Sequence, residues 1–449
     1  MNVLLINDSS SNPNWGDRAA AMALKQMIMA CGGTISSVIT EDDLRDSRFL
    51  RESLAEPVAA PAKRSVKDWA RLLLPPVVLK LREHLLHQLK DSDEAGPIPL
   101  RLDGFDHYVD IFLRDQAAYG GLLDAIETAD IVVIHGDGCM VGNGILPRSE
   151  LFLSYLIKTQ FDNPVILINH TTDFSHPELD RMAEAVYPRL DDVTYRDQTS
   201  ADLCRDRWTG RYAADSAFFF APAERAHWAR LAARPTYFDV WPDRAPFDPL
   251  RPYICIGGSS IYSFDGTPTE IIDGFAALVS HLRLIYSGQI VLTASDVKDE
   301  VIFRPVARAL GLPLVALTTP VQQAVDIIGN ADAYVGGRWH PSIFALRGGT
   351  PILPLSSKTF KMQALIAMAG LPTTPFNALD LQGEKEKIGQ ALTAFVAQGE
   401  ELRRPLRMWA ARQADNSWEN IAFLRRWKEQ ATAGEPEVPK RSSPAGCET

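Results

Sequence analysis

The sequence predicts an α/β protein made of two doubly wound parallel domains that face each other across a cleft. Short apolar runs alternate with helical stretches in two successive series, separated by a segment near 221–250 that is rich in Pro, Arg and Trp. The chain has 449 residues, more than one ordinary core accommodates. We therefore predict an N-terminal domain over 1–225 and a C-terminal domain over 250–404.

The first series begins at the N-terminus. The apolar run 3–6 predicts a strand buried on both faces, and a polar loop leads from it into a helix that begins near Asp17 and ends at Gly32 and Gly33. Residues 41–120 interrupt the alternation and predict a helical insertion. Further strands are expected at 131–134, 165–168 and 193–195, with helices at 150–160, 178–187 and 200–208.

The second series predicts five more strands, at 253–256, 290–293, 313–317, 333–335 and 351–353, with helices between them. The segment 405–431 is helical in pattern and rich in Arg and Trp, and it could cross back to the first domain. The tail 432–449 is rich in Pro, Ser, Glu and Lys, a composition typical of disorder.

Composition excludes several classes of protein. The net charge of -10 argues against general nucleic-acid binding, which needs a basic surface. Five scattered cysteines without a C-x-x-C pair predict neither a disulfide framework nor a zinc site, and they fit a reducing compartment. No apolar run is long enough for a signal peptide or a membrane span. We expect a cytoplasmic protein.

Residues 63–90 leave two interpretations open. They form a basic, Leu-rich pair of helical segments that is broken at Pro75 and Pro76. The favoured interpretation is a helical hairpin packed on the domain, with its Lys and Arg side chains in water. The alternative is a peripheral contact with the anionic inner face of a membrane, as basic amphipathic helices make.

The strongest functional signal is a set of three nitrogen side chains, Arg338, His340 and Lys358, at the ends of two successive predicted strands. Ligands of open parallel sheets bind outside the carboxyl ends of the strands. Arg binds carboxylate or phosphate through two hydrogen bonds, and His exchanges a proton near neutral pH. The group therefore predicts a site for an anionic substrate.

A second candidate is the loop that precedes the first helix, with Asn14, Gly16 and Asp17. A helix N-terminus favours an anion, and glycine permits close backbone approach. Asp17 is in a position to cap the helix, and catalysis is the alternative. The loop has neither the G-x-G-x-x-G fingerprint nor a P-loop, so we predict no nicotinamide or Walker-type site.

Two further turns follow strands of the first series. Gly136, Asp137 and Gly138 form a tight turn that could approach a ligand closely, and no cluster around them suggests a metal site. Arg196 and Asp197 follow the strand at 193–195. We expect Asp197 to cap the next helix and Arg196 to point toward the cleft.

Taken in order, these motifs resemble the polysaccharide pyruvyl transferase family over about residues 1–375. The shared elements are an N-x-G-D loop, a Gly-rich turn, R-D-x-x-S, D-x-A-F, R-x-H-x-x-I-F-A-L, then G-x-P and a Lys, here at 14–17, 136–138, 196–200, 215–218, 338–346, 349–351 and Lys358. The chain departs from the family pattern at Trp339, where a smaller aliphatic residue is usual, and at Asp137, where glycine is usual.

The resemblance implies two Rossmann-like domains arranged as in the B-type glycosyltransferases. It implies transfer of a pyruvyl group from phosphoenolpyruvate, a co-substrate, to a cell-surface glycan or lipid-linked saccharide, giving a ketal and phosphate. No cofactor or metal is expected. The implied roles are His340 as general acid, Arg338, Lys358 and Arg196 as donor-binding residues, and Asp17 or Asp137 as base. Asn14, Gly16, Gly136 and Gly138 would line the acceptor side.

Two other functions remain open. A B-type glycosyltransferase with a nucleotide-sugar donor shares the fold, and a nucleoside diphosphate should stabilise it. A non-catalytic glycan-binding protein is the third possibility, against which the joint presence of Arg338, His340 and Lys358 weighs.

Overall fold

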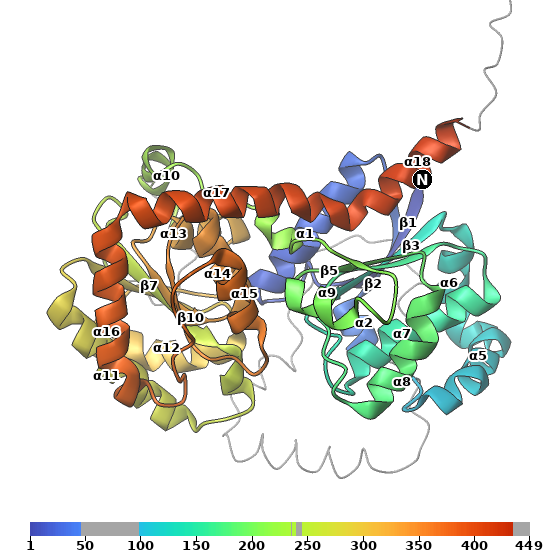
Figure 1. Ribbon diagram of the computed structural model, residues 1–449, viewed down its shortest axis with the longest axis horizontal. Helices are drawn as coiled ribbons and strands as arrows, with labels where there is room; N and C mark the ends of the chain where they lie inside the picture. The colour runs from blue at the N-terminus through green and yellow to red at the C-terminus, as the bar shows by residue number, and fades with distance from the viewer. Residues whose placement is uncertain (46–97, 235, 239–244, 434–449) are drawn as a thin grey trace, which may run out of the picture.

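A computed structural model describes residues 1–45, 98–234, 236–238 and 245–433. It contains two parallel sheets, with strand orders β2-β1-β3-β4-β5-β6 and β11-β10-β7-β8-β9. Figure 1 shows two lobes side by side, one around each sheet, with the helix α17 (Glu400–Ser417) running along one edge of both. The predicted pair of doubly wound α/β domains is confirmed.

The first sheet contains the four strands predicted at 3–6, 131–134, 165–168 and 193–195. The prediction missed β2, an edge strand with the sequence Thr-Ile-Ser-Ser-Val-Ile-Thr that is only partly buried, because its polar side chains hide the apolar signal. The strands are β1 (Asn2–Asp8), β2 (Thr34–Thr40), β3 (Ile131–Asp137), β4 (Val165–His170), β5 (Asp192–Tyr195) and β6 (Arg211–Tyr212).

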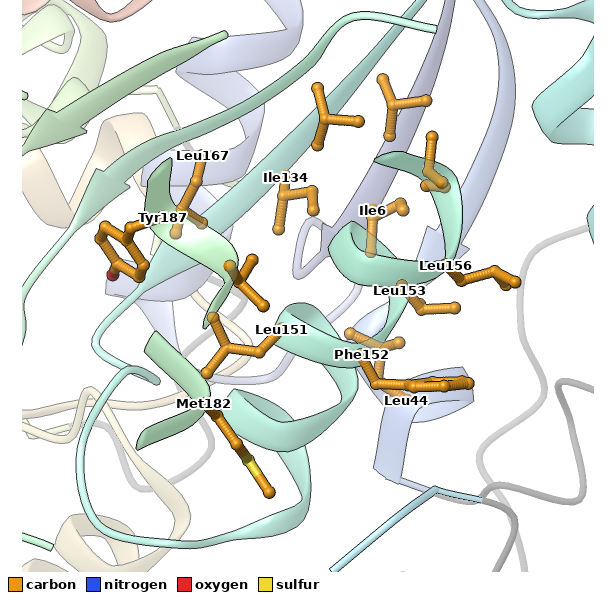
Figure 2. Packing of buried hydrophobic residues seen from close by; sticks show 14 of the residues in the cluster. Ile6, Leu44, Ile134, Leu151, Phe152, Leu153, Leu156, Leu167, Met182 and Tyr187 are labelled. Carbon is orange, nitrogen blue, oxygen red and sulfur yellow. The ribbon is translucent and has the colours of Figure 1, made fainter. Parts of the chain in front are cut away.

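Helices cover both faces of this sheet. In Figure 2, side chains from β1, β3 and β4 meet Leu151, Phe152 and Met182 of the helices α7 and α8. The insertion adds α5 and α6, whose Phe112 lies edge-on to Phe152 with ring centroids 5.1 Å apart. The helices are α1 (Trp15–Ala30), α2 (Glu41–Arg45), α5 (Phe105–Arg114), α6 (Gln116–Thr128), α7 (Ile145–Gln160), α8 (Pro177–Val186) and α9 (Gln198–Cys204).

Residues 63–90 lie outside the described residues, so both interpretations of this segment stay predictions. Within the described ranges, no helix has the length and apolar character that crossing a bilayer requires.

The second sheet has strands at all five predicted places. Its order reverses between β7 and β10, the switch point where open α/β sheets bind ligands. The strands are β7 (Tyr253–Ser259), β8 (Gln289–Thr293), β9 (Leu314–Val315), β10 (Tyr334–Gly337) and β11 (Ile352–Pro354). The helices are α10 (Arg225–Ala232), α11 (Pro268–Ile285), α12 (Val297–Leu310), α13 (Val321–Gly329), α14 (Trp339–Arg347), α15 (Lys361–Ala369) and α16 (Leu381–Gln398).

The chain then returns to the first domain through α17 (Glu400–Ser417), η7 (Trp418–Ile421) and α18 (Ala422–Ala433). Ile421 and Leu424 pack with core residues of β1, β3 and β4. The fully buried Asn420 accepts hydrogen bonds from Thr194 Oγ1 at 2.6 Å and from the Asn169 N–H at 3.1 Å, and it donates to Ala214 O at 2.9 Å. One side chain thus ties the returning segment to the first sheet.

We expect Asn420→Ala to lower the free energy of unfolding by at least about 2 kcal/mol, because it leaves buried donors and acceptors without partners. Urea denaturation measures the change. Arg412→Ala, on the exposed face of α17, is the matched control and should change stability by less than about 0.5 kcal/mol. Equal stability of the two variants would contradict the role given to Asn420.

Candidate functional site

The carboxyl ends of three neighbouring strands in the first sheet have an unusual backbone. Asn7, Asp137 and Asn169, at the ends of β1, β3 and β4, have φ angles of 65°, 41° and 55°. No other non-glycine residue in the described part of the chain has a positive φ. Asn and Asp tolerate this left-handed region better than most residues, and such backbone strain concentrates at functional sites.

Buried polar contacts hold these three turns. Asn7 Nδ2 donates to His135 O at 2.7 Å and to Glu150 Oε1 at 2.9 Å, which ties the end of β1 to β3 and α7. Asn169 Oδ1 accepts from the Ser216 N–H at 2.7 Å. These hydrogen bonds fix the backbone around the turn that carries Asp137.

Arg196 is the centre of the site. It directly follows β5, is 2% exposed, and donates from Nε to Thr171 Oγ1 at 3.0 Å. Its Nη1 contacts Asp137 Oδ1, Asp215 Oδ2 at 3.1 Å and His340 Nε2 at 3.3 Å. One guanidinium thus brings two carboxylates of the first domain together with an imidazole of the second, and the predicted direction of Arg196 is confirmed.

The first turn of α14 supplies the partners from the second domain. Trp339 Nε1 donates to Asp215 Oδ2 at 2.8 Å, and the Arg196 guanidinium carbon lies 5.5 Å from the centroid of the Trp339 ring. The indole therefore both binds the carboxylate and covers the guanidinium. This explains the large residue at the position where the family pattern has a small one.

His340 lies among three carboxylates. Its Nε2 is 3.5 Å from Asp215 and 3.8 Å from Asp137, and its Nδ1 is 3.9 Å from Asp17. A Cβ atom added to Gly16 would lie 2.0 Å from Nδ1, so only glycine at that position admits the ring. Both imidazole nitrogens face proton acceptors, an arrangement suited to proton transfer.

The interpretation of Asp17 as the helix cap is wrong. Asn14 is the cap of α1, and its Oδ1 accepts from the Gly16 N–H at 2.8 Å and the Asp17 N–H at 3.5 Å. The Asp17 carboxylate therefore stays available toward His340. Burial, followed by repulsion from Asp137 and other carboxylates, raises the pKa of Asp17 well above its usual value. Asp197, in contrast, caps α9 as predicted and accepts from the Ser200 N–H at 2.8 Å.

Arg338 belongs to a second cluster of charges and lies between strand β10 and helix α14. It donates to Asp299 from Nε at 3.1 Å and from Nη2 at 2.8 Å, and Nη2 also lies 3.2 Å from Asp296. Burial raises the pKa of Asp299 to about 6, although the Arg338 charge opposes this. Asp296 accepts a 3.4 Å hydrogen bond from Asn14 Nδ2, which links this second cluster to the first domain.

The structure brings Lys361, rather than Lys358, to the Arg196 cluster. A Cβ added to Gly138 would lie 2.6 Å from Lys361 Nζ and 3.0 Å from Arg196 Nη2. Burial, with the nearby Arg196 charge, lowers the pKa of Lys361. Lys358 is exposed, with its Nζ 3.2 Å from the centroid of the Phe264 ring. Strand β11 ends at Pro354, and the following turn carries Lys361 back to the site at the start of α15.

Sequence reasoning did not assign Asp215, Asp299 or Lys361 to the site. A single Asp in the first turn of α12 or a second Lys after Lys358 gives no signal in one sequence, because both lie on ordinary helices. Gly136, predicted to face the acceptor, lies against His170, whose Cβ would be 2.6 Å from an added Cβ. No described group of three His, Cys, Asp or Glu side chains has the spacing of a metal site.

The two domains also contact each other directly beside the site. Trp15 Nε1 donates to Leu317 O at 3.3 Å, and Arg18 Nη2 donates to Leu317 O and Thr319 O, both at 3.1 Å. Trp15 belongs to the same apolar cluster as Trp339. These contacts keep the end of α1 against the second domain and leave His340 only 7% exposed.

The charge of Arg196 controls the acidity of its partners. Burial would raise the pKa of Asp137, but Arg196, with a smaller effect of His340, lowers it to about 2. The pKa of Asp215 is lowered against burial by His340 and Arg196. Both groups are therefore carboxylates over the physiological range.

We expect Asp137→Asn to lower the free energy of unfolding at pH 7 by about 2 kcal/mol, since its pKa lies about two units below that of an unfolded Asp. The depressed pKa stabilises the fold above about pH 4 and stops doing so as the pH falls toward 2. The difference between wild type and variant should shrink to about half at pH 3. Urea denaturation at pH 7, 5, 4 and 3 measures it.

Asp202→Asn removes an exposed ion pair with Arg205 and should cost less than about 1 kcal/mol at every pH. If Asp137→Asn lowered the free energy of unfolding by the same amount from pH 7 to pH 3, the carboxylate charge would not be the cause of the loss.

Three solved structures show the fold. The UDP-GlcNAc 2-epimerase from Neisseria meningitidis bound to UDP-GlcNAc is 13% identical, with a TM-score of 0.50 over 97% of this chain and 100% of that one. S. aureus MnaA with UDP is 14% identical, with a TM-score of 0.52 over 97% and 99%. Arabidopsis thaliana UGT89C1 complexed with quercetin is 13% identical, with a TM-score of 0.51 over 95% and 98%. The chain thus shares the fold of GT-B glycosyltransferases and epimerases.

No curated protein matches the sequence. A family model does match it: residues 16–359 fit the polysaccharide pyruvyl transferase model. This stretch contains the Arg196 cluster, the loop at Gly16 and the first turn of α14. Because it covers most of the chain, the protein belongs to the polysaccharide pyruvyl transferase family.

Proposed function

We propose that the protein transfers a pyruvyl group from phosphoenolpyruvate to two hydroxyls of one sugar, forming a ketal and releasing phosphate. The acceptor in this proposal is a cell-surface glycan or a lipid-linked saccharide. The observation that supports it most is the buried contact between Arg196 and His340 across the two domains, with Lys361 beside it. A proton donor next to two cations suits a small substrate with two anionic groups.

In this proposal the donor, phosphoenolpyruvate, binds to the positively charged side chains of the site. Phosphoenolpyruvate carries a carboxylate and a phosphate, and Arg196, Arg338 and Lys361 would bind them. Lys361 makes no ion pair with any side chain that the structure describes, so its charge is available without displacing a carboxylate. Arg338, a donor-binding residue predicted from the sequence, would use its guanidinium N–H groups for both Asp299 and the donor.

The proposed reaction conserves protons. His340 gives a proton to the methylene carbon, which becomes a methyl group, and C2 becomes electrophilic. A sugar hydroxyl oxygen bonds to C2 as its proton leaves. The C2–O bond to phosphate then breaks, and the second hydroxyl closes the ketal as it loses its proton. Of the two hydroxyl protons, one restores His340 and the other leaves with phosphate.

Asp17 suits the role of base better than Asp137. Asp137 has a pKa of about 2 and is bound by Arg196, so it has little tendency to take a proton. The raised pKa of Asp17 lets that carboxylate accept one. Its 3.9 Å separation from His340 Nδ1 offers a short path for the proton to return to the imidazole.

Phosphoenolpyruvate should raise the melting temperature of the protein, because a ligand that binds only the folded state stabilises it by mass action, by about 2.7 kcal/mol at a hundred times its Kd. Uridine diphosphate is the control in the same thermal unfolding measurement. A shift with the nucleotide alone would replace the proposal by the alternative, a GT-B glycosyltransferase that uses a nucleotide sugar.

His340→Ala should reduce turnover at least ~10²-fold, the usual contribution of a general acid, and leave the shift by phosphoenolpyruvate largely intact. Lys361→Met should instead weaken donor binding by about 10-fold or more, because it removes a charge-assisted contact to the donor. Lys358→Met is the matched control and should bind the donor as wild type does. Near-normal turnover of His340→Ala would refute the acid assignment, and an equal loss in both Lys variants would refute the assignment of Lys361.

A further inference from the structure

An exposed aromatic ring and an exposed lysine lie together at the ligand-binding edge of the second sheet. Phe264 is 60% exposed, among the most exposed large apolar side chains of the described residues. The Nζ atom of Lys358, also exposed, lies 3.2 Å from the centroid of its ring. Among the side chains that the structure describes, none forms an ion pair with Lys358. We call the two residues the Phe264–Lys358 platform.

The backbone that carries the platform is cross-linked. Phe264 follows η6 (Ser260–Ser263), which continues directly from β7, and Lys358 follows β11. Ser259 Oγ donates to Ser356 O at 2.6 Å, and the Lys358 N–H donates to Ser260 Oγ at 3.4 Å. Two loops from non-neighbouring strands are thus joined to each other, which holds the ring and the amine in register.

The platform lies close to the proposed reaction centre. Its loops leave the carboxyl ends of β7 and β11, on either side of β10, and Arg338 and His340 directly follow β10. Lys358 is three residues before Lys361, whose amine lies beside Gly138 and near Arg196, and three residues span at most about 10 Å. A substrate bound at the cluster can therefore extend onto the platform.

We propose that the Phe264–Lys358 platform binds the acceptor, and that this acceptor is a saccharide joined to a phosphate. An aromatic ring packs against the apolar C–H face of a sugar, and a lysine binds phosphate as a point charge. In the free protein the ammonium lies on the ring, where it makes a cation–π contact. The sugar takes its place on the ring, and the charge moves to the phosphate.

This assignment rests on the proposed function, since it supplies the acceptor side of that reaction. It also gives different roles to two lysines that lie three residues apart in the sequence. The half-buried Lys361 would face the donor, and the exposed Lys358 would face the acceptor. The overall charge of -10 repels a phosphorylated saccharide elsewhere on the surface, so a local cation is needed to hold it.

Ligand-observed NMR tests the proposal with the full-length protein and saturating phosphoenolpyruvate, which blocks the donor site. The probes are the 1-phosphates of glucose, galactose, mannose and N-acetylglucosamine, with the matching methyl glycosides and inorganic phosphate. At least one sugar phosphate should bind wild type under these conditions. Phe264→Ala and Lys358→Met should each weaken it about 10-fold or more, and Lys358→Met should not affect the methyl glycoside.

Leu284→Ala and Lys387→Met, exposed side chains on α11 and α16, are the matched controls and should bind as wild type does. Several results would overturn the proposal: no sugar phosphate bound to wild type, binding unchanged in both platform variants, or inorganic phosphate bound as tightly as the sugar phosphate. Loss of the probe when phosphoenolpyruvate is added would show that it occupies the donor site.

The thermal shift by phosphoenolpyruvate, measured on the same samples, keeps the two proposals apart. If wild type shows no shift, the proposed donor is wrong whatever the platform binds. If all variants show the shift but the platform variants bind sugar phosphate normally, only the platform is refuted.

Discussion

The buried guanidinium of Arg196 is the interaction on which the rest of the site depends. A charge that is 2% exposed is tolerated only when carboxylates and hydrogen-bond acceptors surround it, and removing one partner of such a pair costs about 3–5 kcal/mol. Asp137 and Asp215 provide this compensation from two different turns of the first domain. Their positions in turn depend on the left-handed turn at Asp137 and on the 3-10 segment that Asp215 caps.

The same cluster joins the two domains. Trp339 and His340 reach it from the first turn of α14, while Gly16 leaves the space that the imidazole occupies. His340 and Arg338 are 7% and 8% exposed in this arrangement. The contact between α1 and α14 thus shields both side chains from water, which strengthens the electrostatic interactions around them.

The division of charge between the two clusters has a chemical consequence. Around Arg196 the carboxylates are held ionised, with the pKa of Asp137 at about 2, whereas at Asp17 and Asp299 burial raises the pKa. Carboxyl groups with different affinities for a proton thus lie within one site, which is how a protein assigns separate acid and base roles to similar side chains. The positions of Lys361 and Lys358 make the same distinction for cations, one half-buried near Arg196 and one exposed on Phe264.

The sequence by itself determined the two-domain architecture, most strands of both sheets, and the places of Arg196, Arg338 and His340. Apolar periodicity and chain order carry that information, because parallel strands bring their carboxyl ends to one edge whatever the details of packing. Only the tertiary structure decided that Asn14 rather than Asp17 caps α1, and that Lys361 rather than Lys358 reaches the cluster. The cap depends on local side-chain geometry, since Asn14 reaches the N–H groups of Gly16 and Asp17. The choice of lysine depends on which side chain meets Arg196, a residue more than a hundred positions away in the sequence.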